Sequence, residues 1–302
     1  MRLTKHTEVL RKTNNMLINK FLEFKQNIEP TDSQIEQISI SNNNIREKLS
    51  NSNIIEIIDS FLIGSYSRNT LIRPINDIDI FLKVHYGRHN KLLPKQIINM
   101  LHCKAIRIFS KSTIKSDSPC VIIDFEHCTF ELIPYFAYDN IPDIFIIPNH
   151  DGSNFIHSSP FKINELLTKS NEQHDGKLIP LIKMIKNWKR KFPAAKFIKS
   201  FIIEILSLII FNNYKIEDYP SAITYWFNQV AKLFRSPIPF IHDLDNKNLY
   251  VDKYLYDKPL KLMFLRYVIN KSKENANIAL NLYNRGYDDH AYKYYSKLFT
   301  DF

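Results

Sequence analysis

The sequence predicts an α+β protein in which helices flank a central mixed sheet. Apolar residues recur at helical spacing before residue 50. Between residues 54 and 133 they give way to short β-branched runs typical of strands. After Pro160 the helical spacing returns and continues to the end of the chain. We therefore expect N-terminal helices, then an α/β core, then a helical lobe.

The first 50 residues predict two helices separated by a break at Glu29-Pro30. Thr31 and Gln34 have the spacing of a capping box, in which each side chain bonds the other residue's backbone N–H. The second helix is then long and amphipathic. The apolar residues assigned to the buried faces are Val9, Leu10, Ile18, Phe21, Leu22, Ile35, Ile38, Ile45 and Leu49.

The rest of the chain divides by the period of its apolar residues. Residues 139–149 are expected to be irregular or an edge strand, because Pro142 and Pro148 cannot donate to a sheet. A loop is expected at 236–250. Strands are expected at 54–63, 78–84, 121–125 and 129–133, and helices at 93–109, 160–169, 176–192, 197–212, 217–234, 259–273 and 275–298.

A net charge of +10 over 302 residues suggests anionic partners. A nucleoside triphosphate pocket needs only a few cations, whereas a nucleic-acid surface needs a basic stripe. Lysines are spread along the chain, with one dense run at Lys183–Lys191. We assign most of this charge to solvated surface.

The three cysteines, Cys103, Cys120 and Cys128, are odd in number and form no CxxC pair. They are interpreted as reduced, mostly buried thiols rather than as disulfides or a zinc site. The sequence has no uncharged apolar stretch of about 18 residues, and its N-terminus lacks the apolar run of a signal peptide. We expect a cytoplasmic protein with no membrane partner.

One stretch carries the chemistry: Gly64-Ser65 ends a predicted strand, and Asp77 and Asp79 follow on the next. Glycine allows backbone amides to approach a phosphate closely, and the serine hydroxyl adds a donor. Side chains two residues apart on a strand project from the same face, about 7 Å apart at their Cα atoms. This spacing suits a pair of divalent ions about 3.5–4 Å apart.

The neighbours of the two aspartates, Ile78, Ile80 and Phe81, are apolar, so the strand is expected to be largely buried. Two buried carboxylates side by side are costly unless a cation neutralises them. An Asp-x-Asp pair alone would be a weak signal. The combination with Gly-Ser indicates a metal site for Mg²⁺, whose preferred ligands are oxygens.

The stretch FLIGSYSRNTLIRPINDIDIFL resembles the catalytic signature of the DNA polymerase β-like nucleotidyltransferase superfamily. More narrowly, the chain is similar to the bacterial cGAS/DncV-like nucleotidyltransferases (CD-NTases), which make cyclic di- or trinucleotides in anti-phage signalling. Further segments carry the resemblance: IEPTDSQIEQISISNNNIREKL looks like the spine helix, FELIPYF like the third metal-ligand strand, and KLIPLIKMIKNWKRKF with IKSFIIEILSLI like the segments that grip the triphosphate.

The resemblance implies that Asp77 and Asp79 bind both metal ions and that Glu131 is the third carboxylate. Aspartate is the commoner residue at the third position, so Glu131 is a departure from the family pattern. Asp124, on the preceding predicted strand, is the alternative. The expected cofactor is two Mg²⁺ ions, with Mn²⁺ as an alternative.

The resemblance also implies the nucleotide contacts. Gly64 and Ser65 are expected to cradle the β- and γ-phosphates, and Lys186 and Ser200 to reach the triphosphate from the helical lobe. Lys183 and Lys199 are the alternatives to Lys186. Ser159 is the candidate for a base contact, although a turn before a helix explains it equally well. Glu204 is expected to be a structural partner of a basic residue.

The implied fold is a polymerase β-like core with an N-terminal spine helix, packed on a C-terminal helical lobe, with the active site in the cleft between them. The implied domains are residues 1–160 and 161–302. The implied reaction joins ribonucleoside triphosphates into a cyclic di- or oligonucleotide second messenger with release of pyrophosphate. The implied partners are the nucleoside triphosphates. Nucleic acid is a possible partner but is not required, and a downstream effector is expected to bind the product rather than the enzyme.

Three alternatives stay open at this point. In the first, the nucleotide is transferred to an RNA or a protein rather than to another nucleotide. In the second, the enzyme is a sensor that a bound nucleic-acid duplex switches on. In the third, the chain is a degenerate fold that only binds nucleotides or partners, which the full set of carboxylate positions disfavours.

Overall fold

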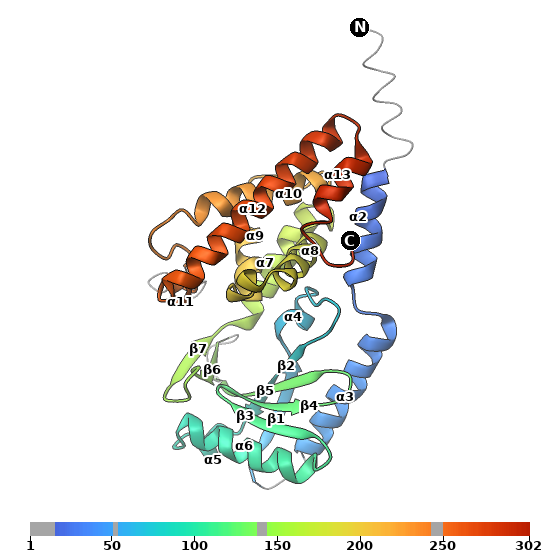
Figure 1. Ribbon diagram of the computed structural model, residues 1–302. Helices are drawn as coiled ribbons and strands as arrows, with labels where there is room; N and C mark the ends of the chain where they lie inside the picture. The colour runs from blue at the N-terminus through green and yellow to red at the C-terminus, as the bar shows by residue number, and fades with distance from the viewer. Residues whose placement is uncertain (1–15, 51–53, 138–143, 243–249) are drawn as a thin grey trace. The chain divides into compact units, whose positions relative to one another are not determined.

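The computed structural model describes residues 16–50, 54–137, 144–242 and 250–302. The chain forms two compact units, which we call the sheet unit (Pro30–Glu165) and the helical unit (helix α2 with Leu166–Phe302). The predicted α+β class is confirmed, with helices and a mixed sheet in the places where the apolar period changes (Figure 1).

Helix α2 (Met16–Ile28) groups with the helical unit, whereas the sequence analysis kept both N-terminal helices with the sheet in residues 1–160. Its buried face contacts α8, α10 and α13. The ring of Phe21 lies edge-on to Tyr295, 5.2 Å between centroids, and to Phe302, 4.6 Å. The predicted break at Glu29-Pro30 is thus the point where the chain passes from one unit to the other. Val9 and Leu10 lie outside the described residues.

The sheet unit is built on a mixed sheet with the strand order β1-β2-β5-β4-β3, to which β6 and β7 are attached through β5. Strands β2 and β5 are parallel, and the other pairs are antiparallel. Its strands are β1 (Ile57–Leu62), β2 (Asp77–Val84), β3 (Thr113–Asp117), β4 (Cys120–Asp124), β5 (Thr129–Ala137), β6 (Phe145–Pro148) and β7 (Phe155–Ser158), and its helices are α3 (Asp32–Ser50), α4 (Gly64–Ser67), α5 (Tyr86–His89) and α6 (Pro94–Ile108).

The two faces of the sheet differ in polarity. Ile78, Ile80 and Leu82 of β2 are fully buried in one core with α3 and α6. The residues that alternate with them, Asp77, Asp79 and Phe81, belong to the opposite face. Phe81 packs there in a smaller apolar cluster with Ile133, Tyr135 and Phe145.

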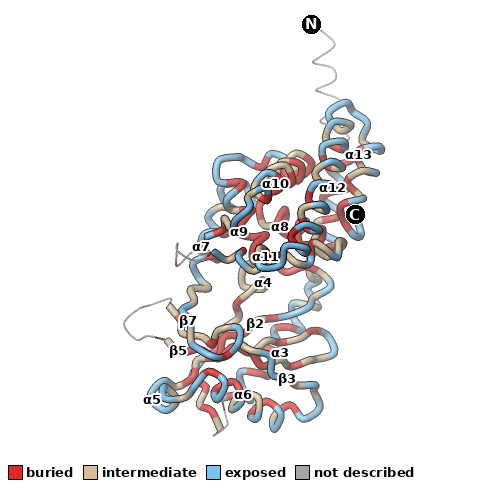
Figure 2. The backbone as a smooth tube through the Cα atoms, turned by 60° about the vertical axis from the view of Figure 1, so that its left-hand side comes forward, coloured by how far each residue is buried: buried red, intermediate tan, exposed pale blue. Residues whose placement is uncertain are grey.

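The helical unit encloses two tryptophans, and its central helices are largely buried (Figure 2). Trp188 and Trp226 are fully buried, and each indole N–H donates to a serine hydroxyl, Ser272 at 2.8 Å and Ser207 at 3.1 Å. Its elements are α7 (Pro160–Gln173, whose first residues belong to the sheet unit), α8 (Leu178–Lys191), the 3-10 turn Pro193–Phe197, α9 (Ser200–Phe211), α10 (Tyr219–Leu233), α11 (Lys253–Tyr256), α12 (Pro259–Asn284) and α13 (Asp288–Tyr295).

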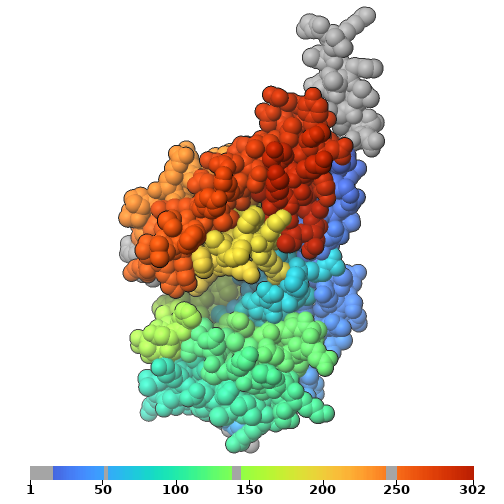
Figure 3. Space-filling model, viewed as in Figure 1, coloured from blue at the N-terminus to red at the C-terminus, as the bar shows by residue number. Residues whose placement is uncertain are grey.

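Helix α12 shows where the sequence analysis divided the chain wrongly. The sequence analysis placed a break near residue 274, but α12 continues to Asn284 at the surface of its unit (Figure 3). The chain turns at Gly286, whose φ of +83° is the left-handed conformation that commonly ends a helix. No helix-breaking residue stands at 274, so apolar spacing alone misplaced the boundary.

The capping box at Thr31 and Gln34 is confirmed. Thr31 N–H donates to the Gln34 side chain at 3.0 Å, and Gln34 N–H donates to the Thr31 hydroxyl at 3.2 Å. Strands β3 and β7 were not predicted, because both are short and carry no alternating apolar pattern. Strand β6 falls within the predicted irregular segment 139–149, of which residues 139–143 lie outside the described part of the chain.

All three cysteines are free thiols, as predicted. Cys120 and Cys128 are buried, but Cys103 is exposed on α6. None of the described helices is both long and apolar enough to cross a membrane.

Candidate active site

The carboxylates of β2 and β5 meet on one face of the sheet. The parallel register aligns Asp79 with Glu131 and Asp77 with Thr129. Paired residues on neighbouring strands project to the same side, with the strands about 4.8 Å apart. Asp77, Asp79 and Glu131 therefore form one carboxylate cluster, which is how we refer to these three residues below.

This cluster is less buried than the sequence suggested. Asp77 is exposed and Asp79 is half-buried, because the apolar neighbours Ile78 and Ile80 fill the core on the opposite face. The expectation of two buried aspartates is thus wrong in degree. The side-chain alternation of a strand separates the apolar residues from the acidic ones.

Glu131 lies where its charged form is disfavoured. Burial, followed by the negative charges of Asp79, Asp77 and Asp117, raises its pKa to about 7. The buried Cys120 thiol lies 3.9 Å from Glu131 Oε2, and burial and the charge of Glu131 raise the pKa of that thiol to about 12. The thiol therefore stays protonated and is a weak donor to the carboxylate.

Asp117 and Cys120 lie on the hairpin of β3 and β4, and the sequence analysis missed both as neighbours of the cluster. The only available signal was the pairing of β4 with β5. That pairing aligns Ile122 with Glu131 and so brings the nearby hairpin turn beside it.

Asp124, the alternative third carboxylate, has partners of its own. Thr129 Oγ1 donates to Asp124 Oδ1 at 2.9 Å, and Lys115 Nζ lies 3.6 Å from Oδ2. In the sheet Asp124 is level with Thr129 and one strand further from β2 than Glu131. This arrangement favours Glu131 as the third member of the cluster.

The Gly-Ser turn lies directly against Asp79. Gly64 has φ of +69°, and a Cβ added there would overlap the Asp79 carboxylate, with Cγ only 2.7 Å away. The preceding residue, Ile63, donates its N–H to Asp79 O at 2.9 Å. Glycine is thus required twice, by its backbone conformation and by its contact with the carboxylate.

A side-chain relay holds this turn in place. Ser67 Oγ donates to Gly64 O at 3.2 Å, and Asn164 Nδ2 on α7 donates to Ser67 Oγ at 3.3 Å. Ser65, the predicted phosphate donor, is half-buried in α4. Ser159, the predicted base contact, immediately precedes α7, where its carbonyl accepts the N–H of Lys162.

In the helical unit, Lys186 is buried and its Nζ lies 2.6 Å from Oε1 of the fully buried Glu204. The expectation that Glu204 partners a basic residue is confirmed. The alternative Lys183 pairs with Glu29 at 3.1 Å. The alternative Lys199 stacks its ammonium over Tyr254, 5.0 Å from the ring centroid.

Ser200 begins α9 and accepts a hydrogen bond from Lys189 Nζ at 2.9 Å. Spacing along one helix did not reveal this contact, because Ser200 comes from the next helix.

The donor set fits a hard divalent cation, since all three members of the cluster are carboxylates. Among the described residues, however, no three His, Cys, Asp or Glu side chains are arranged to hold a metal ion as they stand. Burial first, and then the charges of Asp79, Asp77 and Asp117, raise the pKa of Glu131 and so disfavour its negative charge. A bound cation would favour that charge.

Comparison with known proteins identifies the family. A model described as the Second Messenger Oligonucleotide or Dinucleotide Synthetase (SMODS) domain matches residues 16–171, just over half of the chain. The chain belongs to the SMODS family. The assignment to the cGAS/DncV-like nucleotidyltransferases is therefore confirmed, and with it the synthesis of a nucleotide second messenger.

Known relatives of this SMODS protein match it in sequence or in fold. A cyclic AMP-AMP-AMP synthase from Acinetobacter sp. is 23% identical over 90% of this chain and 81% of its own length. The structure of E. coli MS115-1 CdnC with ATP has a TM-score of 0.71 at 18% identity, covering 94% of this chain and 97% of CdnC. Vibrio cholerae DncV with a linear intermediate also has a TM-score of 0.71, at 12% identity and 91% and 92% coverage.

The contact between Gly64 and Asp79 can be tested by Gly64→Ala. We expect activity to fall by about 100-fold, since the added methyl displaces the Asp79 carboxylate. Gly176→Ala is the matched control, because Gly176 also has a positive φ, +75°, but nothing lies within 4 Å of its added Cβ. Both variants should lose similar stability in thermal unfolding, and only Gly64→Ala should lose turnover. Equal turnover in the two variants would show that Asp79 is not held by this contact.

The raised pKa of Glu131 gives a stability test in metal-free protein. The folded state binds this proton more tightly than the unfolded state, so the free energy of unfolding falls as pH rises from about 4.5 to about 7. Glu131→Gln should melt with the wild type at about pH 5 and above it at about pH 8. Asp124→Asn should show no such gain, because Thr129 and Lys115 stabilise Asp124. Thermal melts in the presence of a chelator measure the stability of both variants. A gain in stability for Asp124→Asn and none for Glu131→Gln would show that Glu131 is not the carboxylate with the raised pKa.

Proposed function

We propose that this SMODS protein is a metal-dependent synthase that joins ribonucleoside triphosphates into a cyclic di- or oligonucleotide with release of pyrophosphate. The observation that carries the proposal is the register of β2 and β5, which aligns Asp79 with Glu131 on the face that carries Asp77. The contact of Gly64 with Asp79 joins the Gly-Ser turn to the same face.

In this proposal Asp77, Asp79 and Glu131 hold two Mg²⁺ ions, with Mn²⁺ as an alternative. The bound ions lower the pKa of the attacking hydroxyl and neutralise the leaving pyrophosphate. A carboxylate of the cluster accepts the proton of a ribose hydroxyl while that oxygen bonds to the α-phosphorus of a second nucleotide. The bond from that phosphorus to pyrophosphate breaks, and the same reaction, repeated within the linear product, closes the ring.

The nucleotide contacts are assigned by the same proposal. Gly64 and Ser65 bind phosphate oxygens through backbone N–H groups and the hydroxyl. In the helical unit, Lys186 and Ser200 bind the triphosphate, with Lys186 held by Glu204 and Lys189 adding a cation at Ser200. Ser159 reads a base edge.

The biological role we propose is anti-phage signalling in the cytoplasm, in which an effector responds to the product. The name of the Acinetobacter relative makes cyclic adenine trinucleotides the first products to look for.

The product test uses the purified chain with all four ribonucleotides and magnesium, followed by phosphatase and mass spectrometry. We expect a phosphatase-resistant cyclic product, its absence in chelator, and no product from Asp77→Ala/Asp79→Ala. The double variant should remain folded, because Asp77 is exposed and Asp79 is half-buried. Turnover by the double variant at the wild-type rate would exclude the cluster as the metal site. A product formed only on added RNA, only on protein, or only in the presence of duplex would replace the cyclase with one of those alternatives.

The role of Lys186 can be separated from its structural role. Lys186→Ala should raise the nucleotide KM and lower stability by about 3–5 kcal/mol, since it removes the ion-pair partner of the fully buried Glu204 carboxylate. Lys186→Ala/Glu204→Leu removes both charges and should recover most of the stability without restoring KM. Steady-state kinetics and urea denaturation give the two quantities. Recovery of KM together with stability would mean that Lys186 serves only the fold.

A further inference from the structure

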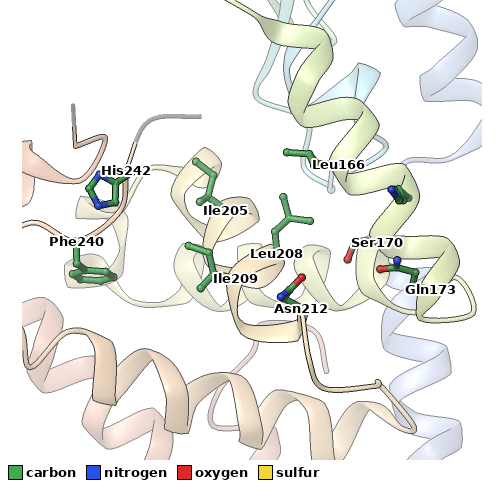
Figure 4. Close-up of a pocket in the computed structure, with 10 residues that line it drawn as sticks. Leu166, Ser170, Gln173, Ile205, Leu208, Ile209, Asn212, Phe240 and His242 are labelled. Carbon is green, nitrogen blue, oxygen red and sulfur yellow. The ribbon is translucent and has the colours of Figure 1, made fainter. Parts of the chain in front are cut away.

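A cavity of about 890 Å³ lies within the helical unit, between α7, α9 and the segment that contains Phe240 and His242 (Figure 4). All of the side chains that line it belong to this unit. Its volume is in the range of pockets that hold small molecules, about 300–1,000 Å³. None of the residues assigned above to catalysis or nucleotide binding lines it.

The middle of the cavity is apolar. Leu166 from α7 and Leu208 from α9 point into the same space, beside Ile205 and Ile209 (Figure 4). Leu166 is 39% exposed and Ile209 is 50% exposed, although both are large aliphatic side chains on well-packed helices. Aliphatic surface that faces a concave, solvent-filled space is characteristic of a ligand-binding site.

The ends of the cavity carry polar side chains, and none of the described residues that line it is a carboxylate. Gln173 and Asn212 lie at one end (Figure 4). Lys169 also lines the cavity, one helical turn before Gln173 on α7. Phe240 and His242 lie at the other end and offer ring faces. An anionic group would find a counter-charge at Lys169. A flat ring system would cover the apolar middle and meet Phe240.

The wall at Phe240 is held firmly. The fully buried carboxylate of Asp252 accepts the N–H of Phe240 and of Ile241, both at 3.1 Å. The Phe240 ring lies edge-on to Phe234, 5.3 Å between centroids. This side of the cavity is therefore preformed, which lowers the ordering cost of binding.

We propose that this cavity binds a small amphipathic molecule with a flat apolar body and one anionic group. Its floor is the same helix, α9, that carries Glu204, the ion-pair partner of Lys186. Ile205 lines the cavity and directly follows Glu204 in the chain, so a bound molecule would contact helix α9 next to the residue that positions Lys186. The bound molecule therefore regulates turnover, and this second part rests on the proposed function.

Anilinonaphthalene sulfonate has the required chemistry, an aromatic body with one sulfonate, and its fluorescence reports binding. We expect one saturable site, with a dissociation constant raised about tenfold by Ile209→Asp and by Lys169→Glu. Met263→Asp is the matched control for the first variant, because Met263 is 52% exposed on α12 and lies outside the cavity. Lys232→Glu, on α10, is the control for charge. Equal effects of the variants and their controls would overturn the site.

Binding is measured a second time in Asp77→Ala/Asp79→Ala, where the dissociation constant should be unchanged. Because this variant lacks the proposed metal ligands, its affinity for the probe tests the cavity independently of catalysis. The binding result therefore does not depend on the outcome of the product test. In the wild type, the probe should change the rate of product formation with a midpoint at its dissociation constant, and Ile209→Asp should shift that midpoint about tenfold. A rate that stays constant as the site saturates would overturn the regulatory part.

Discussion

Parallel hydrogen bonding between β2 and β5 holds Asp79 level with Glu131, and the carboxylate cluster follows from that register. A slip of one residue would place Phe130 or Leu132 beside Asp79 instead, because strand side chains alternate between the two faces. The register is fixed from the other side of the sheet, where Ile80 and Leu132 are fully buried in one core with α3 and α6. The apolar face thus determines the geometry of the acidic one.

The same constraint explains the Gly-Ser turn. Strand β1 is hydrogen bonded to β2, and the turn that leaves it, at Gly64, meets the Asp79 carboxylate where any side chain would overlap. The relay from Asn164 through Ser67 to the Gly64 carbonyl then fixes the turn from α7. The result is a Gly-Ser turn held beside a carboxylate by three separate segments of the chain.

Several lysines of the helical unit form ion pairs or hydrogen bonds within that unit, which the composition of the chain does not reveal. In the basic run of α8, Lys183 pairs with Glu29, and Lys186 pairs with Glu204. Lys189 bonds Ser200, and Lys191 donates to the carbonyls of Ser296 and Phe299 at 2.8 and 2.6 Å. The lysines of this run are therefore engaged in the fold, whereas the sequence analysis assigned most of the chain's charge to solvated surface. The run is not a free basic stripe of the kind that nucleic-acid binding needs.

The sequence alone determined what depends on local spacing. The alternation of β2, the capping box at Thr31 and the Gly-Ser and Asp-x-Asp motifs were all readable from neighbouring residues, and they led to the SMODS family. Tertiary structure decided what depends on distant partners. The alignment of Glu131 with Asp79 and the grouping of α2 with the helical unit join segments far apart in the chain. The pairing of Lys186 with Glu204 joins two different helices. Periodicity reports which face of an element is apolar, but only packing determines which element covers it.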